Sequence, residues 1–234
     1  RDFCLSRGLG DVYKRQPNGY TIAKDVKFTV TDELKAAEKV VMENTPIEVN
    51  ISKTDITTDK ELPGATLQIL KKAAAVTDDG EETETEEVVT TIYGEKLEWK
   101  STGEPKNIKG LPAGEYILRE SAAPDGYTVA ADVTFTVTDE LKAVETVEMQ
   151  DAPIETVISK VDMADTAKEL PGATLQILKK VTAEDGTTSE EIAVTVYGEK
   201  LQWISGEEAK EIKGLPAGDY IPVSYTHLRA HETG

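Results

Sequence analysis

The chain repeats itself. The segment ELPGATLQILKK occupies positions 61–72 and returns unchanged at 169–180. In the same way PNGYTIAKDVKFTVTDEL, which begins at Pro17, returns as PDGYTVAADVTFTVTDEL from Pro124. The repeating unit is therefore roughly 100 residues long, enough to bury its own core, whereas the units of a solenoid, about 20–45 residues long, depend on their neighbours. The sequence predicts tandem domains.

The register of the repeats predicts where each domain begins and ends. One complete unit spans 47–153; the C-terminal part of a repeat precedes it at 17–46, and the N-terminal part of another follows it at 154–221. The joints MENTPIEVNISK and MQDAPIETVISK contain almost no spacer between the last strand of one unit and the first strand of the next. We therefore expect neighbouring repeats of the chain to be each other's partners in a semi-rigid rod.

The two ends of the chain do not fit this register. Residues 1–16 have no counterpart in the repeat, and the last copy follows GLPAGDYI only to Ile221 before it changes to PVSYTHLRAHETG at 222–234. Both segments resemble translated sequencing-adapter tails, and we expect them to be non-native. No signal peptide and no apolar run of membrane length is visible, so we expect no membrane insertion in this fragment.

The composition argues against several kinds of chemistry. The one cysteine, Cys4, and both histidines, His227 and His231, lie in these end segments, so the repeats lack disulfides, Cys/His zinc sites and histidine-based triads. With 44 acidic and 26 basic residues the formal net charge is −18, which disfavours nucleic acid and anionic lipid as partners. We expect no metal, no cofactor and no nucleic-acid partner.

Apolar residues in the repeat alternate with a period of two. Ile47, Val49 and Ile51 are separated by polar neighbours, and the same alternation runs through 133–137. These runs are short, rich in Val, Ile and Thr, and bounded by turn signals such as LPG, GLPAG and PDG. The pattern predicts an all-β chain of tandem Ig-like sandwiches with about seven strands each.

Three polar side chains share the inward-facing phase of these strands. Lys53 continues the inward positions of the first strand, Glu120 those of EYILRE, and Asp151 those of the last strand, VEMQD. An isolated buried charge costs several kcal/mol or is neutralised by a pKa shift, downward for an amine and upward for a carboxyl group. A neutral amine beside a protonated carboxyl group is suited to nucleophilic attack.

The motifs ISKTD, ELPGATLQIL, GLPAGEYILRE, APDGYTVA and MQDAP together resemble the prealbumin-like, collagen-adhesin B-type (SpaA-type) repeats of Gram-positive surface adhesins and pilins. The resemblance covers 17–221. In that family a first-strand lysine condenses with a last-strand Asn or Asp into an intramolecular isopeptide bond, promoted by a Glu of the YxLxE strand. By position, the resemblance implies Lys53 as the nucleophile, Asp151 as the electrophile and Glu120 as the proton-relaying group.

The same trio is also compatible with a buried, hydrogen-bonded ion cluster that never reacts, and the sequence leaves both interpretations open. Neither truncated copy contains the full trio. The first copy has Asn44 at the position of Asp151, and the last has Lys160 at the position of Lys53. We therefore expect a single cross-link in the chain.

The resemblance implies an extracellular protein attached to the cell wall, in which the repeats form the stalk or backbone of an adhesin or pilin. The alternative is an adhesive module that recognises a host glycan or matrix protein. We do not expect an enzyme, because the repeats contain no nucleophile–base pair or metal cluster outside the trio, and a buried trio cannot admit a substrate.

Overall fold

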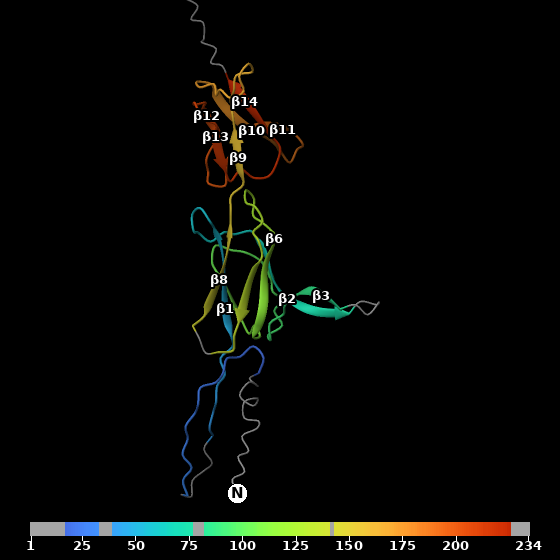
Figure 1. The fold of residues 1–234 in the computed structure, drawn as a ribbon, viewed down its shortest axis with the longest axis vertical. Coiled ribbons are helices and arrows are strands. Elements are labelled where there is room, and N and C mark those ends of the chain that lie inside the picture. Colours follow the sequence, from blue (N-terminus) through green and yellow to red (C-terminus); the bar gives the residue numbers. More distant parts are fainter. Residues whose placement is uncertain (1–16, 33–38, 77–81, 141–142, 226–234) are drawn as a thin grey trace, which may run out of the picture. The chain divides into compact units, whose positions relative to one another are not determined.

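The computed structural model describes residues 17–32, 39–76, 82–140 and 143–225 (Figure 1). Every regular secondary-structure element in these ranges is a β-strand, which confirms the all-β prediction. The predicted tail at 1–16 and the part of the predicted tail beyond residue 225 lie outside the described residues. The described part of the chain contains no helix with the length and hydropathy of a membrane span.

The chain divides into two compact units. Unit 1 comprises 1–54, 59–122 and 130–150, and unit 2 comprises 55–58, 123–129 and 151–234. The division differs from the sequence repeat in two ways: residues 17–46 are counted with unit 1, and the short segments 55–58, 123–129 and 151–153 are counted with unit 2.

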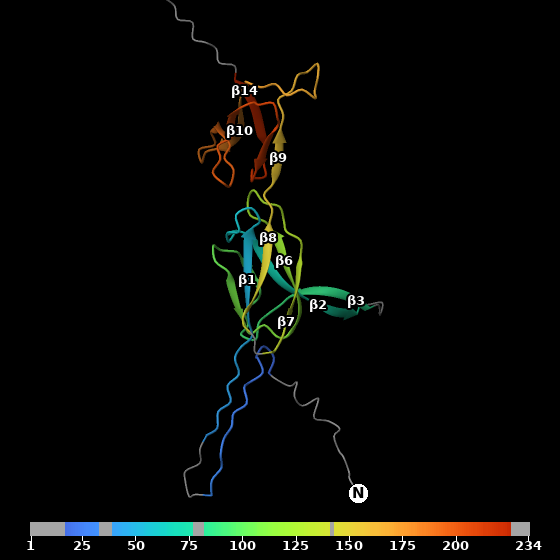
Figure 2. The same cartoon turned by 60° about the vertical axis from the view of Figure 1, so that its left-hand side comes forward.

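Unit 1 is a sandwich of two sheets. One sheet has the strand order β3–β2–β6–β7, with β4 also paired to β2, and the other has the order β5–β1–β8. The strands are β1 (Glu48–Asp55), β2 (Thr66–Val76), β3 (Glu82–Val88), β4 (Glu98–Lys100), β5 (Lys106–Lys109), β6 (Gly114–Ala122), β7 (Val133–Val137) and β8 (Glu145–Asp151). Figure 2 shows β1 and β8, the first and last strands of the repeat, side by side.

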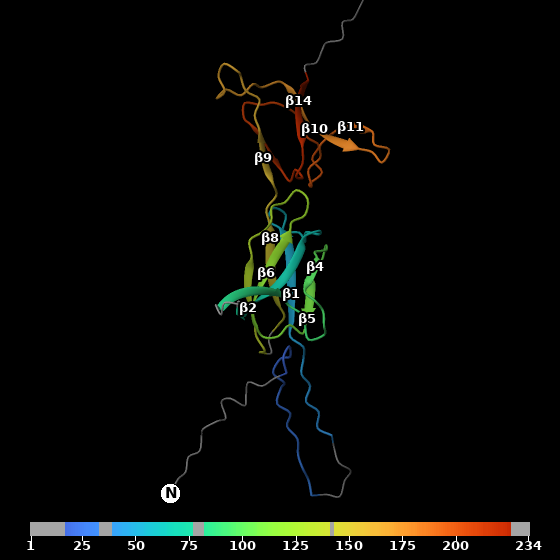
Figure 3. The same ribbon diagram turned by 90° about the vertical axis from the view of Figure 1, so that its right-hand side faces the viewer.

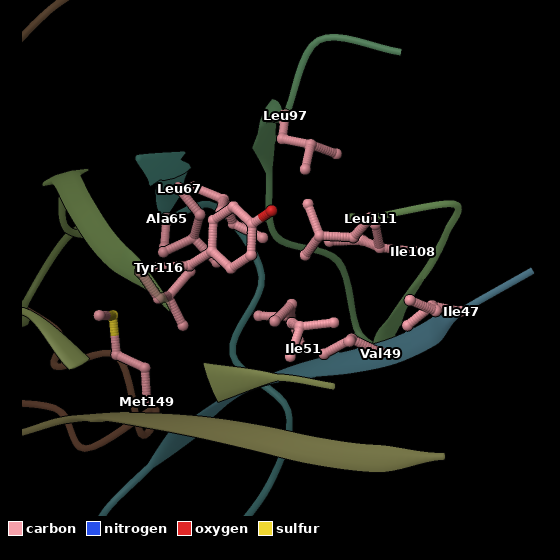
Figure 4. Packing of buried hydrophobic residues seen from close by; sticks show 13 residues of the cluster. Ile47, Val49, Ile51, Ala65, Leu67, Leu97, Ile108, Leu111, Tyr116 and Met149 are labelled. Atoms are coloured by element: carbon pink, nitrogen blue, oxygen red, sulfur yellow. The ribbon is translucent and has the colours of Figure 1, made fainter. Parts of the chain in front are cut away.

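The core of unit 1 lies between the two sheets. Figure 4 shows Val49 and Ile51 of β1 on one side of it, with Leu67 of β2 and Tyr116 of β6 on the other. The predicted alternation is present, because the apolar residues of β1 are buried while their polar neighbours Glu48 and Asn50 are only partly covered. Val and Ile at alternate positions suit this arrangement, since a pleated strand sends successive side chains to opposite faces.

Unit 2 repeats part of this arrangement with a smaller core. Its strands are β9 (Glu155–Ile158), β10 (Thr174–Thr182), β11 (Thr188–Ile192), β12 (Gln202–Ile204), β13 (Lys210–Lys213) and β14 (Tyr220–Tyr225). β10 pairs with β11, β12 and β14, and β13 pairs with β9; Figure 3 shows the β10–β11 hairpin. β14 runs beyond residue 221, the predicted end of the repeat, and pairs Tyr225 with Thr174.

Two methionines at the same position of successive repeats test the core of unit 1. Met149 in β8 is 1% exposed, whereas Met42 is 61% exposed. We expect Met149→Ala to lower the free energy of unfolding by about 2–5 kcal/mol, because it leaves a cavity in the core. Met42→Ala should change it by less than about 0.5 kcal/mol. Urea denaturation of both variants measures the difference, and equal losses would contradict the placement of Met149.

Candidate functional site

The three polar residues singled out by their strand phase all lie in the interior. Lys53 of β1 is 1% exposed, Glu120 of β6 is 4% exposed and Asp151 of β8 is 0% exposed. Lys53 is also among the largest side chains that are almost completely buried. Such residue types are seldom buried unless they are paired, so their contacts decide what the site can do.

Lys53 and Glu120 form an ion pair away from solvent. The Nζ of Lys53 lies 3.2 Å from Oε1 of Glu120, and the two side chains are 1% and 0% exposed. The other carboxyl oxygen, Oε2, accepts a hydrogen bond of 2.7 Å from the backbone amide of Ala130. With one oxygen at the amine and the other at an amide, the carboxyl group of Glu120 has a fixed orientation.

Strand register brings Glu120 to this place. Its partner across the β2–β6 ladder is Leu67, and a register shift lies between Thr66 and Leu67. β6 continues antiparallel along β2 so that Leu118 pairs with Ile69, and both residues are buried in the core. The acid is therefore held by a central strand of its sheet rather than by a loop.

The turn after β1 holds the backbone of Lys53. The amide of Lys53 donates to Oε2 of Glu61 at 3.2 Å, and its carbonyl accepts from the amide of Leu62 at 2.6 Å. The hydroxyl of Ser52 donates to the other oxygen of Glu61. Sequence reasoning missed this role of Glu61, although its exact repetition in ELPGATLQILKK was the available signal.

Asp151 ends the strand next to β1. β8 is the neighbour of β1 in the sheet, and the backbone carbonyl of Asp151 accepts a 3.0 Å hydrogen bond from the amide of Ile56. Three residues earlier on β8, Glu148 accepts a 2.8 Å hydrogen bond from the hydroxyl of Thr54. Residue numbers rise together along the two strands, which is the order of a parallel pair.

The equivalents in the neighbouring copies have different surroundings. Asn44 is partly covered and lies outside the named strands. Lys160 is also partly covered, and its amide donates to Glu169 at 2.9 Å just as that of Lys53 donates to Glu61. In β14, Ser224 pairs with Leu175 where Glu120 pairs with Leu67, so a hydroxyl replaces the acid in this copy.

The described residues contain no group of three or more His, Cys, Asp or Glu side chains arranged to hold a metal ion.

Comparisons with known proteins identify the domain that carries this site. Residues 47–153 match the family model for the SpaA prealbumin-like fold domain. A search of curated proteins gives no significant match. Among solved structures, the Bacillus anthracis TIE protein is 23% identical over 91% of this chain and 35% of its own length, with a TM-score of 0.40. The chain thus spans about a third of that protein.

Two pilins are similar to the chain at comparable levels. A streptococcal ancillary pilin is 21% identical over 90% of this chain and 67% of its own, with a TM-score of 0.32. The C-terminal domain of the shaft pilin SpaA from Lactobacillus rhamnosus GG is 20% identical over 46% of this chain and 98% of its own, also with a TM-score of 0.32. With the family match, the two-sheet fold and the motifs quoted above, residues 47–153 are a SpaA-type prealbumin-like domain.

Proposed function

We propose that the chain is part of the stalk or backbone of a surface adhesin or pilin, and that its complete repeat is stapled by an amide bond between Lys53 and Asp151. The observation that carries the proposal is the buried 3.2 Å pair of Lys53 and Glu120, together with the fully buried Asp151 at the end of β8, the strand next to the β1 strand of Lys53. A SpaA-type domain is a structural module and not an enzyme. The reaction occurs once per molecule because it consumes Lys53 and Asp151.

The proposed reaction is a condensation without a cofactor. The Nζ lone pair of Lys53 attacks Cγ of Asp151; one C–N bond forms, one C–O bond breaks and one water leaves. Glu120 takes a proton from the attacking nitrogen and gives one to the departing hydroxyl group, so it ends in the state in which it began. No electron is gained or lost in the process.

The surroundings of Lys53 and Glu120 favour this role. Both side chains are buried and lie within 3.2 Å of each other, so the relaying acid is already beside the amine. The amide of Ala130 keeps the acid from turning away, and Glu61 and Leu62 fix the lysine backbone. Reacting groups held in place avoid the entropy of a bimolecular encounter, which lowers the barrier by several kcal/mol.

The product would suit a stalk. It would join the first and last strands of the repeat and close a loop of nearly the whole domain, which by analogy with a long-loop disulfide stabilises by about 4–5 kcal/mol. An amide also resists reduction, and the repeats contain no cysteine for a disulfide. We infer that the protein acts outside the cell, attached to the cell wall, with neighbouring repeats and other pilin subunits as its partners.

Intact-mass spectrometry tests the bond. We expect the measured mass of the full chain to be one water lower than the mass calculated from its sequence, because the condensation expels that water. Glu120→Gln keeps the size of the side chain but cannot relay the proton, so this variant should have the full calculated mass. A branched peptide joining Lys53 to Asp151 should appear after digestion of the parent chain only.

Lys160, the equivalent of Lys53 in the last copy, provides a matched control. Lys160→Ala changes the equivalent residue of the last copy, so it should leave the mass deficit in place. A folded parent chain with its full calculated mass would reject the bond and leave Lys53, Glu120 and Asp151 as an ion cluster.

Pulling single molecules from both ends distinguishes a covalent bond from an ion cluster by the length that the chain gains when it unfolds. With the amide formed, the segment between residues 53 and 151 cannot lengthen, whereas without it this segment would add roughly 300 Å at about 3.3–3.6 Å per residue. We expect that step to be missing from the traces of the parent chain and present in those of Glu120→Gln. The same step in both proteins would contradict the proposal.

A further inference from the structure

The loop PDGY at 124–127 packs on unit 2, although it belongs by sequence to the preceding repeat. Its backbone follows the linker: the amide of Ile154 donates to the carbonyl of Gly126 at 2.8 Å, and that of Thr128 donates to Ala152 at 3.0 Å. Tyr127 and Pro153 form an isolated β-bridge. The loop and the linker thus enter unit 2 together, joined by backbone hydrogen bonds.

Gly126 lies against the next repeat so closely that no side chain fits. A Cβ atom there would be 2.5 Å from Cγ1 of Val196 and 3.0 Å from the carbonyl oxygen of Gly214. Gly126 also has a φ of +83°, a conformation that residues other than glycine rarely adopt. Val196 and Gly214 are joined by a 2.9 Å backbone hydrogen bond, and Gly214 donates to Ile154 at 2.8 Å.

Tyr127 adds side-chain contacts to this seat. Its ring meets the edge of Tyr197 at 6.4 Å between centroids, and its hydroxyl donates to Oδ2 of Asp55 at 3.0 Å. Burial works to raise the pKa of the Asp55 carboxyl, but hydrogen bonds from the amide of Thr57 and from both tyrosine hydroxyls hold this pKa below its usual value. Burial raises the pKa of Tyr127, and its hydrogen bonds with Tyr197 and Asp55 raise this pKa further. Asp55 is thus an ionised acceptor buried at the seat.

The same arrangement occurs independently in unit 1. A Cβ atom on Gly19 of PNGY would be 2.7 Å from Cγ2 of Ile92 and 3.0 Å from the carbonyl oxygen of Gly110. The amide of Ile47 donates to Gly19 at 2.8 Å, as Ile154 does to Gly126.

Two further contacts also recur. Ile92 donates to Gly110 at 3.0 Å, and a hydrogen bond between Tyr20 and Tyr93 raises the pKa of Tyr93. Two occurrences with the same residue types and nearly the same distances indicate a built contact.

We propose that the P-x-G-Y loop of each repeat is a clasp that binds the repeat after it, and that the turn before GEK and the first glycine of GLPAG form the seat. The partner it fits is therefore another copy of this domain, placed directly C-terminal to the loop. Consecutive repeats are joined by the linker and by the clasp. This contact lies beyond the proposed amide, which acts within one repeat, and it does not depend on whether that amide forms.

Amide hydrogen exchange of the full chain tests the clasp through Ile154, Val196 and Gly214, whose amides bond within it. Gly126→Ala adds a methyl group that meets Val196 and the backbone of Gly214, so we expect these amides to exchange at least about tenfold faster. Gly186→Ala is the matched control: its φ is +82° and its added Cβ would meet nothing within 4 Å. It should leave the three amides at the parental rate.

The amides of β10 report whether unit 2 remains folded. Selective loss in Gly126→Ala, with β10 protected, supports the clasp; equal rates in the two glycine variants overturn it. If Gly126→Ala also loses protection in β10, Tyr127→Ala decides, because it removes contacts without creating a clash. The clasp requires that this variant expose the same three amides selectively, and parental rates would overturn it.

Discussion

A lysine and a glutamate that meet away from water are the central constraint on this domain. Removing two charges from water costs several kcal/mol for each, and their attraction repays this only when the geometry is good and the remaining polar atoms are bonded. In the structure the amide of Ala130 bonds the second oxygen of Glu120, and Glu61 and Leu62 hold the backbone of Lys53. The pair also links the two sheets, because Lys53 is on β1 and Glu120 on β6.

Such a pair is weak evidence for stability by itself, since apolar residues of similar volume often stabilise as well or better. Its presence in the interior of the domain therefore calls for a chemical reason. Condensation with Asp151 would supply one, because it converts an amine and an acid into an amide and removes their charges from the interior. The desolvation cost of the unreacted site then becomes part of what drives the reaction.

The sequence predicted the strands and the interior position of the trio for one reason. A strand has a side-chain period of two, so the apolar residues of β1, β6 and β8 fix the direction of Lys53, Glu120 and Asp151 as well. It did not predict which carboxyl group would pair with Lys53. That contact depends on the β2–β6 register and its shift at Thr66/Leu67, which are set by packing between distant segments.

The sequence also did not predict the packing of the PDG loop or the full length of β14. The PDG motif signals a turn, but a turn signal does not say on what the loop packs, and Gly126 meets residues far along the chain. β14 continues to Tyr225 although the repeat motif ends at Ile221, because ladder pairing uses backbone groups and needs no match to the motif. Sequence identity locates the end of the repeat motif, whereas backbone hydrogen bonding determines where the strand ends.

The last copy has the turn and the strand pairing of the site but not its acidic side chain. Lys160 keeps its backbone bond to Glu169, and Ser224 keeps the register of Glu120. The turn and the ladder thus form without the acid. Lys160 is only partly covered, whereas Lys53 is buried; the last copy contains neither the glutamate nor an equivalent of Asp151. The turn thus forms without the full trio, whereas the buried lysine occurs in the copy that has both Glu120 and Asp151.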